Sequence, residues 1–345
     1  MLCYTYHSKG LYSCAITRGN EKSRKRGVDM AAVSVASKNK ERFSNRLLDD
    51  LKKNKELYLL VIPVLAFYFV FHYGPMYGAI IAFQNFRPAL GIAESDFVGF
   101  THFQDFFGSV FFGRVLWNTV RISFLRLIFE FPAPIILALL INEVKNRTFA
   151  RTVQTITYMP FFISMVVVAG MIHTFTREAG IITQMLSVFG IPAQNMLNNV
   201  SYFLPILIVS DIWQGVGWGS IIFLAALQGI DQEQYEAASI DGAGRWKQTL
   251  HVTLPGIMTT IVILFILRMG TVLTVGAEKI LLLYNPLTYE VADVISTFVY
   301  RRGLLDFQFS YATAVGLFNS VVNVAFLCTA NYLSKRVTAD GTSLF

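Results

Sequence analysis

The sequence predicts an all-α protein that crosses a membrane several times. Of its 345 residues, 54% are hydrophobic and only 15% are charged, and the mean hydropathy is +0.50. Soluble domains carry about 25% charged residues, so this chain is strongly depleted in charge. Nearly uncharged runs of about 20 residues also recur along the chain, which is the length that a helix needs to cross a bilayer. Backbone groups in lipid must be satisfied within their own segment, so these runs favour helices.

Six runs are long and apolar enough to be predicted as transmembrane helices. They cover approximately residues 57–83, 115–141, 152–174, 202–227, 254–275 and 309–333. An even number of spans places both ends of the chain on the same side of the membrane.

The distribution of Lys and Arg predicts which side that is. Basic residues are concentrated before Leu57, and others lie in the loop between the second and third runs (Lys145, Arg147 and Arg151) and after the last run (Lys335 and Arg336). By the positive-inside rule these segments are cytoplasmic, so both termini of this multi-pass protein are expected on the cytoplasmic side. The net charge of +7 therefore reflects topology and does not indicate a nucleic-acid partner.

The first 29 residues leave two interpretations open. They are basic and contain no apolar run of the length found in signal peptides. Met30 precedes a second basic stretch that leads into the first predicted span. Translation from Met30 and a genuine cytoplasmic tail are both compatible with this pattern.

A polar, glycine-containing segment separates the fourth and fifth runs and is the most specific motif in the chain. Residues 232–238 are predicted to form a short helix that ends near Gly242, which can adopt the left-handed conformation that closes a helix. Trp246 and Leu250 are four residues apart, and we expect them to hold a second helical piece against the bundle. Pro255 is expected at the start of the fifth span.

This segment resembles the EAA loop of bacterial ABC-importer permeases. That pattern is EAA, three residues, Gly, nine residues, Ile, one residue and Leu-Pro. The chain matches it at Glu236, Ala237, Ala238, Gly242, Leu254 and Pro255 and has Val252 in place of Ile. The resemblance implies an ATPase-coupling loop that includes these residues together with Asp241 and Ala243.

Further segments resemble the LplB-like oligosaccharide permeases over about residues 45–336. They include residues 63–83, the run Gly276-Ala277-Glu278-Lys279, and residues 310–318. The resemblance implies a MetI-like core over residues 110–333, preceded by a basic segment (1–55) and a first helix with its outer loop (56–109), and followed by a tail (334–345). It also implies a second homologous permease, two ATP-binding subunits, an extracytoplasmic binding protein and an oligosaccharide substrate.

No catalytic or metal-binding constellation is present in the sequence. A GxxxxGK[ST] phosphate loop, HExxH, GxSxG and CxxC are all missing, and the five histidines and three cysteines are dispersed. We therefore expect a protein that is not an enzyme and has no cofactor, with ATP used by partner subunits.

Several polar residues lie inside predicted spans, where charges are costly and usually face a cavity or an opposite charge. Arg126 and Glu130 are four residues apart and are predicted to form an ion pair. The candidates for a substrate path, since sugars bind aromatic faces and hydrogen-bonding groups, are Asp211, Trp213, Gln214, Asn319 and Asn323. Contacts between helices explain Asn319 and Asn323 equally well.

The Arg301-Arg302 pair lies in an outer loop, against the general charge pattern. It is compatible with attraction of acidic sugars or with contact to the binding protein. Two other functions are compatible with a polytopic membrane protein, an ion-coupled secondary transporter and a membrane scaffold. The former would use carboxylates within an inverted repeat, which the sequence does not show, and the EAA-like loop would have no purpose in it.

Overall fold

The computed structural model describes residues 53–337, and these confirm the all-α prediction. They form two compact units, one ending at Tyr77 and the other beginning at Gly78. The predicted start at Met30 and the basic segment before residue 53 lie outside the described residues. Five helices are long and apolar enough to cross a membrane, and the count is six if one bent pair is taken as a single span.

The first unit is a single long helical segment. It consists of α2 (Lys55–Tyr68), the π-helical turn η1 (Phe69–Tyr73) and α3 (Gly74–Met76). Together with η2 (Tyr77–Phe83) it gives a candidate span of 29 residues, close to the predicted one. Apolar residues cover every face of this segment, which suits a lipid environment.

The second unit begins with a short hairpin and a surface helix. Strand β1 (Gln84–Asn85) pairs antiparallel with β2 (Asp96–Phe97), with Gln84 opposite Phe97. Helix α4 (Thr101–Gly108) follows, and its Phe106 is fully buried in an aromatic cluster with Phe298.

The second span is continuous over Phe112–Asn142. It consists of α5 (Phe112–Leu125), the π-helical turn η3 (Arg126–Glu130) and α6 (Pro132–Asn142). The wider turn precedes Pro132, which has no N–H to donate, and the N–H of Phe131 reaches back to the carbonyl of Arg126.

The third predicted span, 152–174, is wrong as one straight helix. The chain instead forms α7 (Arg147–Tyr158), η4 (Met159–Phe162), α8 (Met165–Thr176) and, further on, α9 (Ile181–Ser187). Ile163 and Ser164 are extended, and the Ser164 side chain accepts a hydrogen bond from the N–H of Val167, so a new helix is capped there. Apolar composition alone does not reveal this break.

The fourth span is the long helix α10 (Val200–Gln228), preceded by η5 (Met196–Asn198). It packs along α6 and α7, and at Gly217 the backbone of Thr157 comes so close that a Cβ would overlap it. Phe223, Leu227 and Ile230 continue this packing into a cluster with Ile257.

The fifth predicted span, 254–275, is bent, and its helical residues begin and end earlier than expected. After α11 (Gln232–Ile240), the chain forms α12 (Arg245–Gln248), η6 (Thr249–Thr253), α13 (Leu254–Gly256) and α14 (Met258–Met269). The segment Arg245–Gly256 and helix α14 meet at an angle of 59°. A Cβ on Gly256 would come within 2.7 Å of Ile230, so this residue is small where the bent backbone passes α10.

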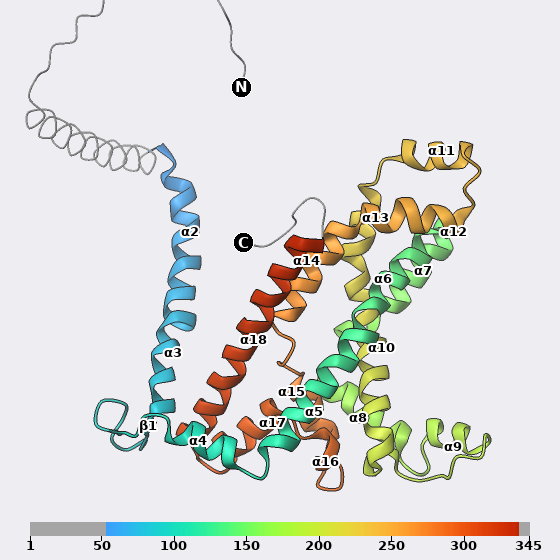
Figure 1. Cartoon of the computed structure of the whole chain (residues 1–345). Helices are drawn as coiled ribbons and strands as arrows, with labels where there is room; N and C mark the ends of the chain where they lie inside the picture. Colours follow the sequence, from blue (N-terminus) through green and yellow to red (C-terminus); the bar gives the residue numbers. More distant parts are fainter. Residues whose placement is uncertain (1–52, 338–345) are drawn as a thin grey trace, which may run out of the picture. The chain divides into compact units, whose positions relative to one another are not determined.

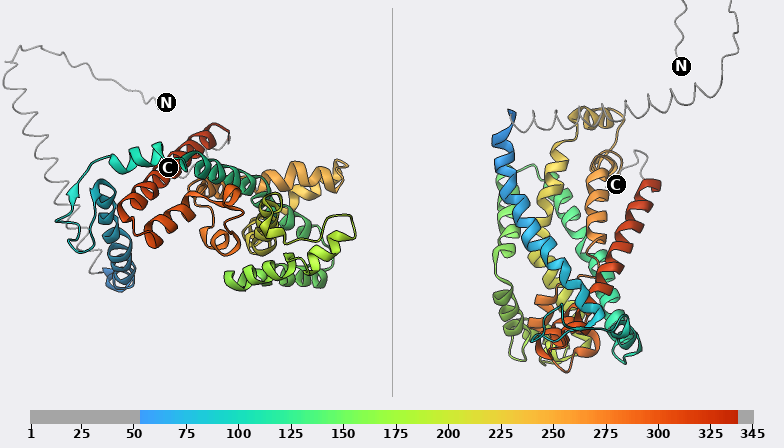
Figure 2. Two further views of the ribbon diagram at one scale, coloured as in Figure 1. Left: turned by 90° about the horizontal axis from the view of Figure 1, so that it is seen from below. Right: turned by 90° about the vertical axis from the view of Figure 1, so that its left-hand side faces the viewer.

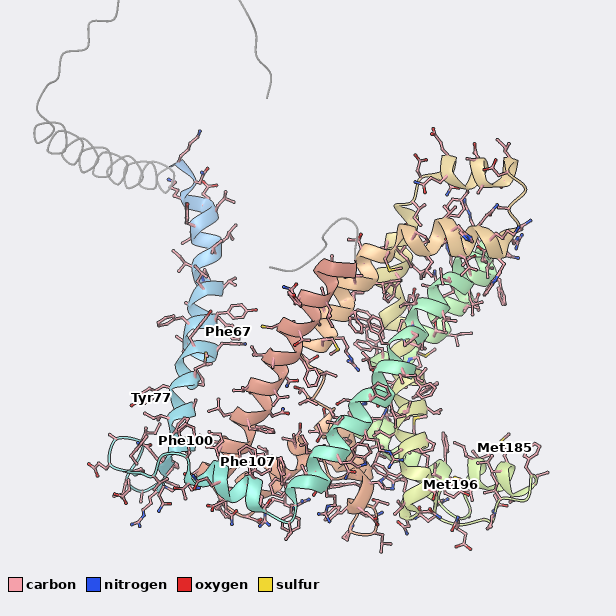
Figure 3. All side chains as sticks on the ribbon, in the orientation of Figure 1. Phe67, Tyr77, Phe100, Phe107, Met185 and Met196 are labelled. Atoms are coloured by element: carbon pink, nitrogen blue, oxygen red, sulfur yellow. The ribbon has the colours of Figure 1, made fainter. Side chains whose placement is uncertain are left out.

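The remaining chain folds back before the last span. The elements are α15 (Ala277–Leu283), α16 (Tyr289–Ala292), α17 (Ile295–Tyr300), η7 (Arg301–Leu305) and α18 (Phe309–Val337). The long helices of the second unit run between two ends, one with α11 and the other with α4, α9 and α16 (Figure 1, Figure 2). We call these the α11 end and the α16 end. Figure 3 shows how many side chains project from the outer faces of the long helices, and many of the exposed ones are large and apolar, as lipid requires.

Candidate functional site

Helix α11 forms an exposed projection at the α11 end of the second unit (Figure 1). It begins at Asp231, whose side chain accepts a hydrogen bond from the N–H of Glu233 (3.0 Å), and none of its residues is buried. The chain reverses at Gly242, where φ is +75°, and the N–H of Ala243 bonds to the carbonyl of Ala238. The left-handed conformation predicted at Gly242 is therefore confirmed.

Side chains at the base of α11 connect it to the bundle. The Tyr235 hydroxyl donates to Thr253 Oγ1 (3.0 Å), and Thr253 is only 1% exposed. Gln248 Nε2 donates to Ser239 Oγ (2.9 Å) and to the carbonyl of Ala243 (3.0 Å). Movement of α11 would therefore pull directly on η6, which leads into α13 and α14.

The residues that match the EAA pattern lie in two parts of the loop, the exposed helix α11 and the start of α13. Glu236 and Ala237 are exposed on α11, whereas Leu254 and Pro255 begin α13. The expectation that Trp246 and Leu250 pack against the bundle is wrong, since they are 75% and 43% exposed. Tyr235 and Val252 make the contact with the core instead, because η6 and the base of α11 face inward.

A charge network lies inside the second unit and consists of Arg126, Glu130, Asp211, Arg268 and Lys279. Asp211 accepts hydrogen bonds from Arg126 Nη2 at 2.5 Å and from Lys279 Nζ at 2.8 Å. The Lys279 side chain is 1% exposed, and those of Arg126 and Asp211 are 10% and 11% exposed. Buried charges require such pairing, so these three residues stabilise one another.

The predicted pair of Arg126 and Glu130 is confirmed, with Nε and Oε2 3.8 Å apart. However, Arg126 lies closer to Asp211, and Glu130 lies closer to Arg268 Nη2, at 2.9 Å. The network thus joins η3, α10, α14 and α15. A Cβ at Gly276 would lie 3.3 Å from Arg126 Nη1, so a glycine lets α15 approach the guanidinium.

Sequence reasoning missed Lys279 as a member of this network. Its signal was a lysine within the apolar helix α15, beyond the fifth predicted span. The non-helical residues 270–276 join the end of α14 to the start of α15. This connection turns the chain so that Lys279 reaches Asp211.

The candidate substrate-path residues do not form one cluster. Trp213 is 43% exposed and lines an apolar cavity of about 490 Å³ between α8, α9 and α10. Gln214 donates to the carbonyl of Ile163 at 3.4 Å. Asn323 accepts from the N–H of Leu273 (3.0 Å) and therefore joins α18 to the chain after α14. Asn319 Oδ1 is buried and has no hydrogen-bond partner among residues 53–337.

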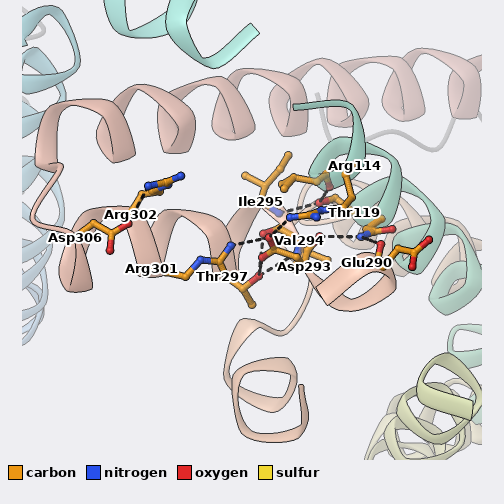
Figure 4. Close-up of polar contacts among 12 residues, drawn as sticks. Arg114, Thr119, Glu290, Asp293, Val294, Ile295, Thr297, Arg301, Arg302 and Asp306 are labelled. Carbon is orange, nitrogen blue, oxygen red and sulfur yellow. Dashed lines mark hydrogen bonds and ion pairs between the residues drawn. The ribbon is translucent and has the colours of Figure 1, made fainter. Parts of the chain in front are cut away.

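The Arg301-Arg302 pair is neutralised by local carboxylates at the α16 end (Figure 4). The fully buried Asp293 accepts from Arg301 Nη2 (2.6 Å) and Thr297 Oγ1 (3.0 Å), and Arg114 Nη2 lies 3.6 Å away. Burial lowers the pKa of Arg301, but the hydrogen bond and charge of Asp293 outweigh it and raise that pKa. Arg302 pairs with Asp306 at 3.1 Å. The two arginines stabilise the α16 end, and neither is a free basic group.

Comparison with known proteins shows the same architecture in transport permeases. The chain is 44% identical over 292 residues to Protein LplB of Bacillus subtilis, covering 84% of this chain and 92% of that protein. It is 42% identical over 303 residues to the polygalacturonan/rhamnogalacturonan transport system permease protein YteP of the same organism, covering 88% and 94%.

A solved structure agrees with this similarity. A chain of a bacterial alginate ABC transporter, in complex with an alginate pentasaccharide-bound periplasmic protein, matches with a TM-score of 0.79 and 42% identity. The match covers 87% of this chain and all of that one (100%). The family described as binding-protein-dependent transport system inner membrane component matches residues 130–339. The chain therefore spans the membrane as a transport permease and belongs to this family, the inner membrane components of binding-protein-dependent transport systems.

Proposed function

We propose that this chain is the permease subunit of an ABC importer for an oligosaccharide. A second homologous permease would complete the path through the lipid bilayer, an extracytoplasmic binding protein would deliver the sugar, and two separate ATP-binding subunits would supply the energy. The names of similar proteins support the sugar class, since they include polygalacturonan/rhamnogalacturonan and alginate transporters. The chain itself would bind no cofactor and catalyse no reaction.

The observation that carries the proposal is the geometry of α11. Its exposed residues Glu236 and Ala237, with the half-buried Ala238, form a small surface that another protein can approach closely. Asp241, Gly242 and Ala243 form the turn that sets its angle. A closing ATPase pair would push α11, and the bonds from Tyr235 and Gln248 would carry that movement to η6 and α14.

This mechanism sets the orientation of the chain. The ATP-binding subunits are cytoplasmic, so the α11 end would face the cytoplasm and the α16 end the binding protein. The basic residue Lys145 precedes α7, and Arg147 and Arg151 lie in the first part of this helix, at the end that this orientation makes cytoplasmic. The protein would lie in the bacterial inner membrane with both termini inside.

The substrate path would run beside the charge network. A cavity of about 370 Å³ between α6, α10 and α14 is lined by Glu130, Gly215, Gly219 and Arg268, among others. Asp211 would hold the cations in place instead of binding sugar directly, because both of its oxygens are already ion-paired. Trp213, Gln214, Asn319 and Asn323 remain candidates for contact with sugar hydroxyls and rings.

Substitution at Gly242 tests the coupling role. A β-branched residue is strained at φ +75° although no neighbouring atom lies within 4 Å, so Gly242→Val should change the turn and leave the fold intact. We expect a complex that still hydrolyses ATP but transports sugar at least about tenfold more slowly, which corresponds to about 1.4 kcal/mol.

The matched control is Gly244→Ala, since Gly244 has φ −69° and equally open surroundings. Uptake should be assayed in proteoliposomes containing the whole transporter, with sugars, amino acids and peptides as substrates. Normal sugar uptake by Gly242→Val would contradict the coupling role, and uptake of amino acids or peptides alone would contradict the oligosaccharide assignment.

A further inference from the structure

Arg121 is a cation inside a membrane span, and no carboxylate of the described residues neutralises it. Its side chain is exposed on α5, and no acidic group of residues 53–337 lies within 4 Å of it, the distance of an ion pair. It stands nine residues from the start of the span at Phe112, or about 13 Å along the helix axis. A charge at such depth usually faces a cavity or a partner, because lipid solvates it poorly.

Arg121 faces a cavity of about 520 Å³ between α5, η3 and the outer half of α10. Leu125 and Phe129 continue the same face of α5 and η3 at four-residue intervals, and the opposite wall includes Leu204 and Ile208 of α10. The walls are otherwise largely apolar, so a charge–charge contact made here is stronger than in water.

The charge network, which lies further along the span than Arg121, adds to the positive electrostatic potential near this residue. The charge network holds three cations and two carboxylates and therefore has an excess of one positive charge. Its nearest cation along the helix, Arg126, is five residues from Arg121, or about 7.5 Å along the axis. The path beside α5 thus carries a positive potential that its own carboxylates do not cancel.

We propose that Arg121 binds the carboxylate of an acidic sugar unit as the oligosaccharide passes this cavity, and so selects uronate-containing substrates. The inference rests on the proposed function and narrows its substrate class. A guanidinium can hold a carboxylate through two parallel hydrogen bonds, and the apolar walls fit the faces of a sugar ring.

The size of the cavity favours a sugar over a carboxylate from the second permease. Ligand sites span about 300–1,000 Å³, and this cavity falls within that range. The two occupants also differ in consequence, since only a sugar carboxylate makes the effect of Arg121 depend on substrate charge.

The test compares an acidic substrate with its neutral counterpart. Trigalacturonate and the same trisaccharide with its carboxyl groups reduced to alcohols share the ring skeleton and linkages, and they differ only at C6, where a carboxylate replaces a neutral hydroxymethyl group. Uptake of each is measured in proteoliposomes with the complete transporter, and binding is measured on the permease pair in nanodiscs without the binding protein. The variants are Arg121→Gln, Arg121→Lys and the control Arg177→Gln, which removes an equal charge from an exposed position between α8 and α9.

We expect Arg121→Gln to lower uptake and binding of trigalacturonate by about tenfold or more, the usual effect of losing a charge-assisted hydrogen bond. The reduced trisaccharide should be affected less than about twofold. Arg121→Lys should retain part of the acidic activity, and Arg177→Gln all of it.

Three results would overturn the proposal. They are an equal loss for both trisaccharides, unchanged trigalacturonate binding in Arg121→Gln, and dissociation of the second permease from that variant. A wild-type transporter that takes up only the neutral trisaccharide would also overturn it, while leaving the oligosaccharide function intact. Uptake of neither trisaccharide, together with uptake of another solute class, would refute the proposed function itself.

Discussion

The α11 loop and the charge network differ in how much of their stability comes from contacts with the rest of the protein. No residue of α11 is buried, and two side chains, Tyr235 and Gln248, make its side-chain hydrogen bonds to the bundle. The charge network is largely enclosed and joins four elements through ion pairs. The exposure of α11 suits its proposed role as a docking surface, whereas the buried charges of the network require partners of opposite charge.

Removing the acid at the centre of the network should give the largest effect on stability. Asp211→Asn leaves Arg126 and Lys279 buried without a carboxylate between them. Breaking a buried pair by removing one partner costs about 3–5 kcal/mol, so we expect a large loss of thermal stability in detergent.

The control for this change is Asp306→Asn, since Asp306 is half exposed and pairs with Arg302 at 3.1 Å. Exposed pairs contribute about 0–1 kcal/mol, so this variant should unfold close to the wild type. Adding Lys279→Met to Asp211→Asn should recover part of the stability. If both single carboxylate variants behaved alike, the network would not differ from a surface pair.

The sequence predicted these two regions unequally, and the reason is physical. Fixed spacing within one loop identifies Glu236, Gly242 and Pro255, because a helix, its closing turn and a following helix start are local features. Asp211 is 85 residues from Arg126 and 68 from Lys279, so their pairing depends on the tertiary fold.

The same distinction applies to the spans. Hydropathy located the second and fourth spans within a few residues, since composition and length decide them. It missed the extended break at Ser164 and the 59° bend between α13 and α14, which depend on capping and on packing against Ile230.

A substitution that overpacks the contact between α7 and α10 should cause a smaller loss of thermal stability than Asp211→Asn. It tests whether the span depends on this close contact as well as on its apolar composition. In Gly217→Ala the added methyl group overlaps the backbone of Thr157 and forces α7 away from α10. Overpacking of this kind costs about 1–3 kcal/mol. Gly215→Ala, two residues earlier on the same helix, meets no atom within 4 Å and should leave thermal stability near that of the wild type. Equal stabilities for the two variants would show that α7 does not require this close approach.

The smallest expected effect on stability concerns the connection between α11 and the bundle. Tyr235→Phe keeps the ring in the core but removes the hydroxyl that donates to Thr253 Oγ1. A typical hydrogen bond contributes about 1 kcal/mol, so the fold should persist with a slightly lower melting temperature. We expect more ATP hydrolysed per sugar imported, because α11 would then move with less effect on η6. Tyr202→Phe, near the start of α10 and away from α11, is the control and should leave that ratio unchanged. A normal ratio in Tyr235→Phe would mean that Gln248 and the backbone carry the movement without this bond.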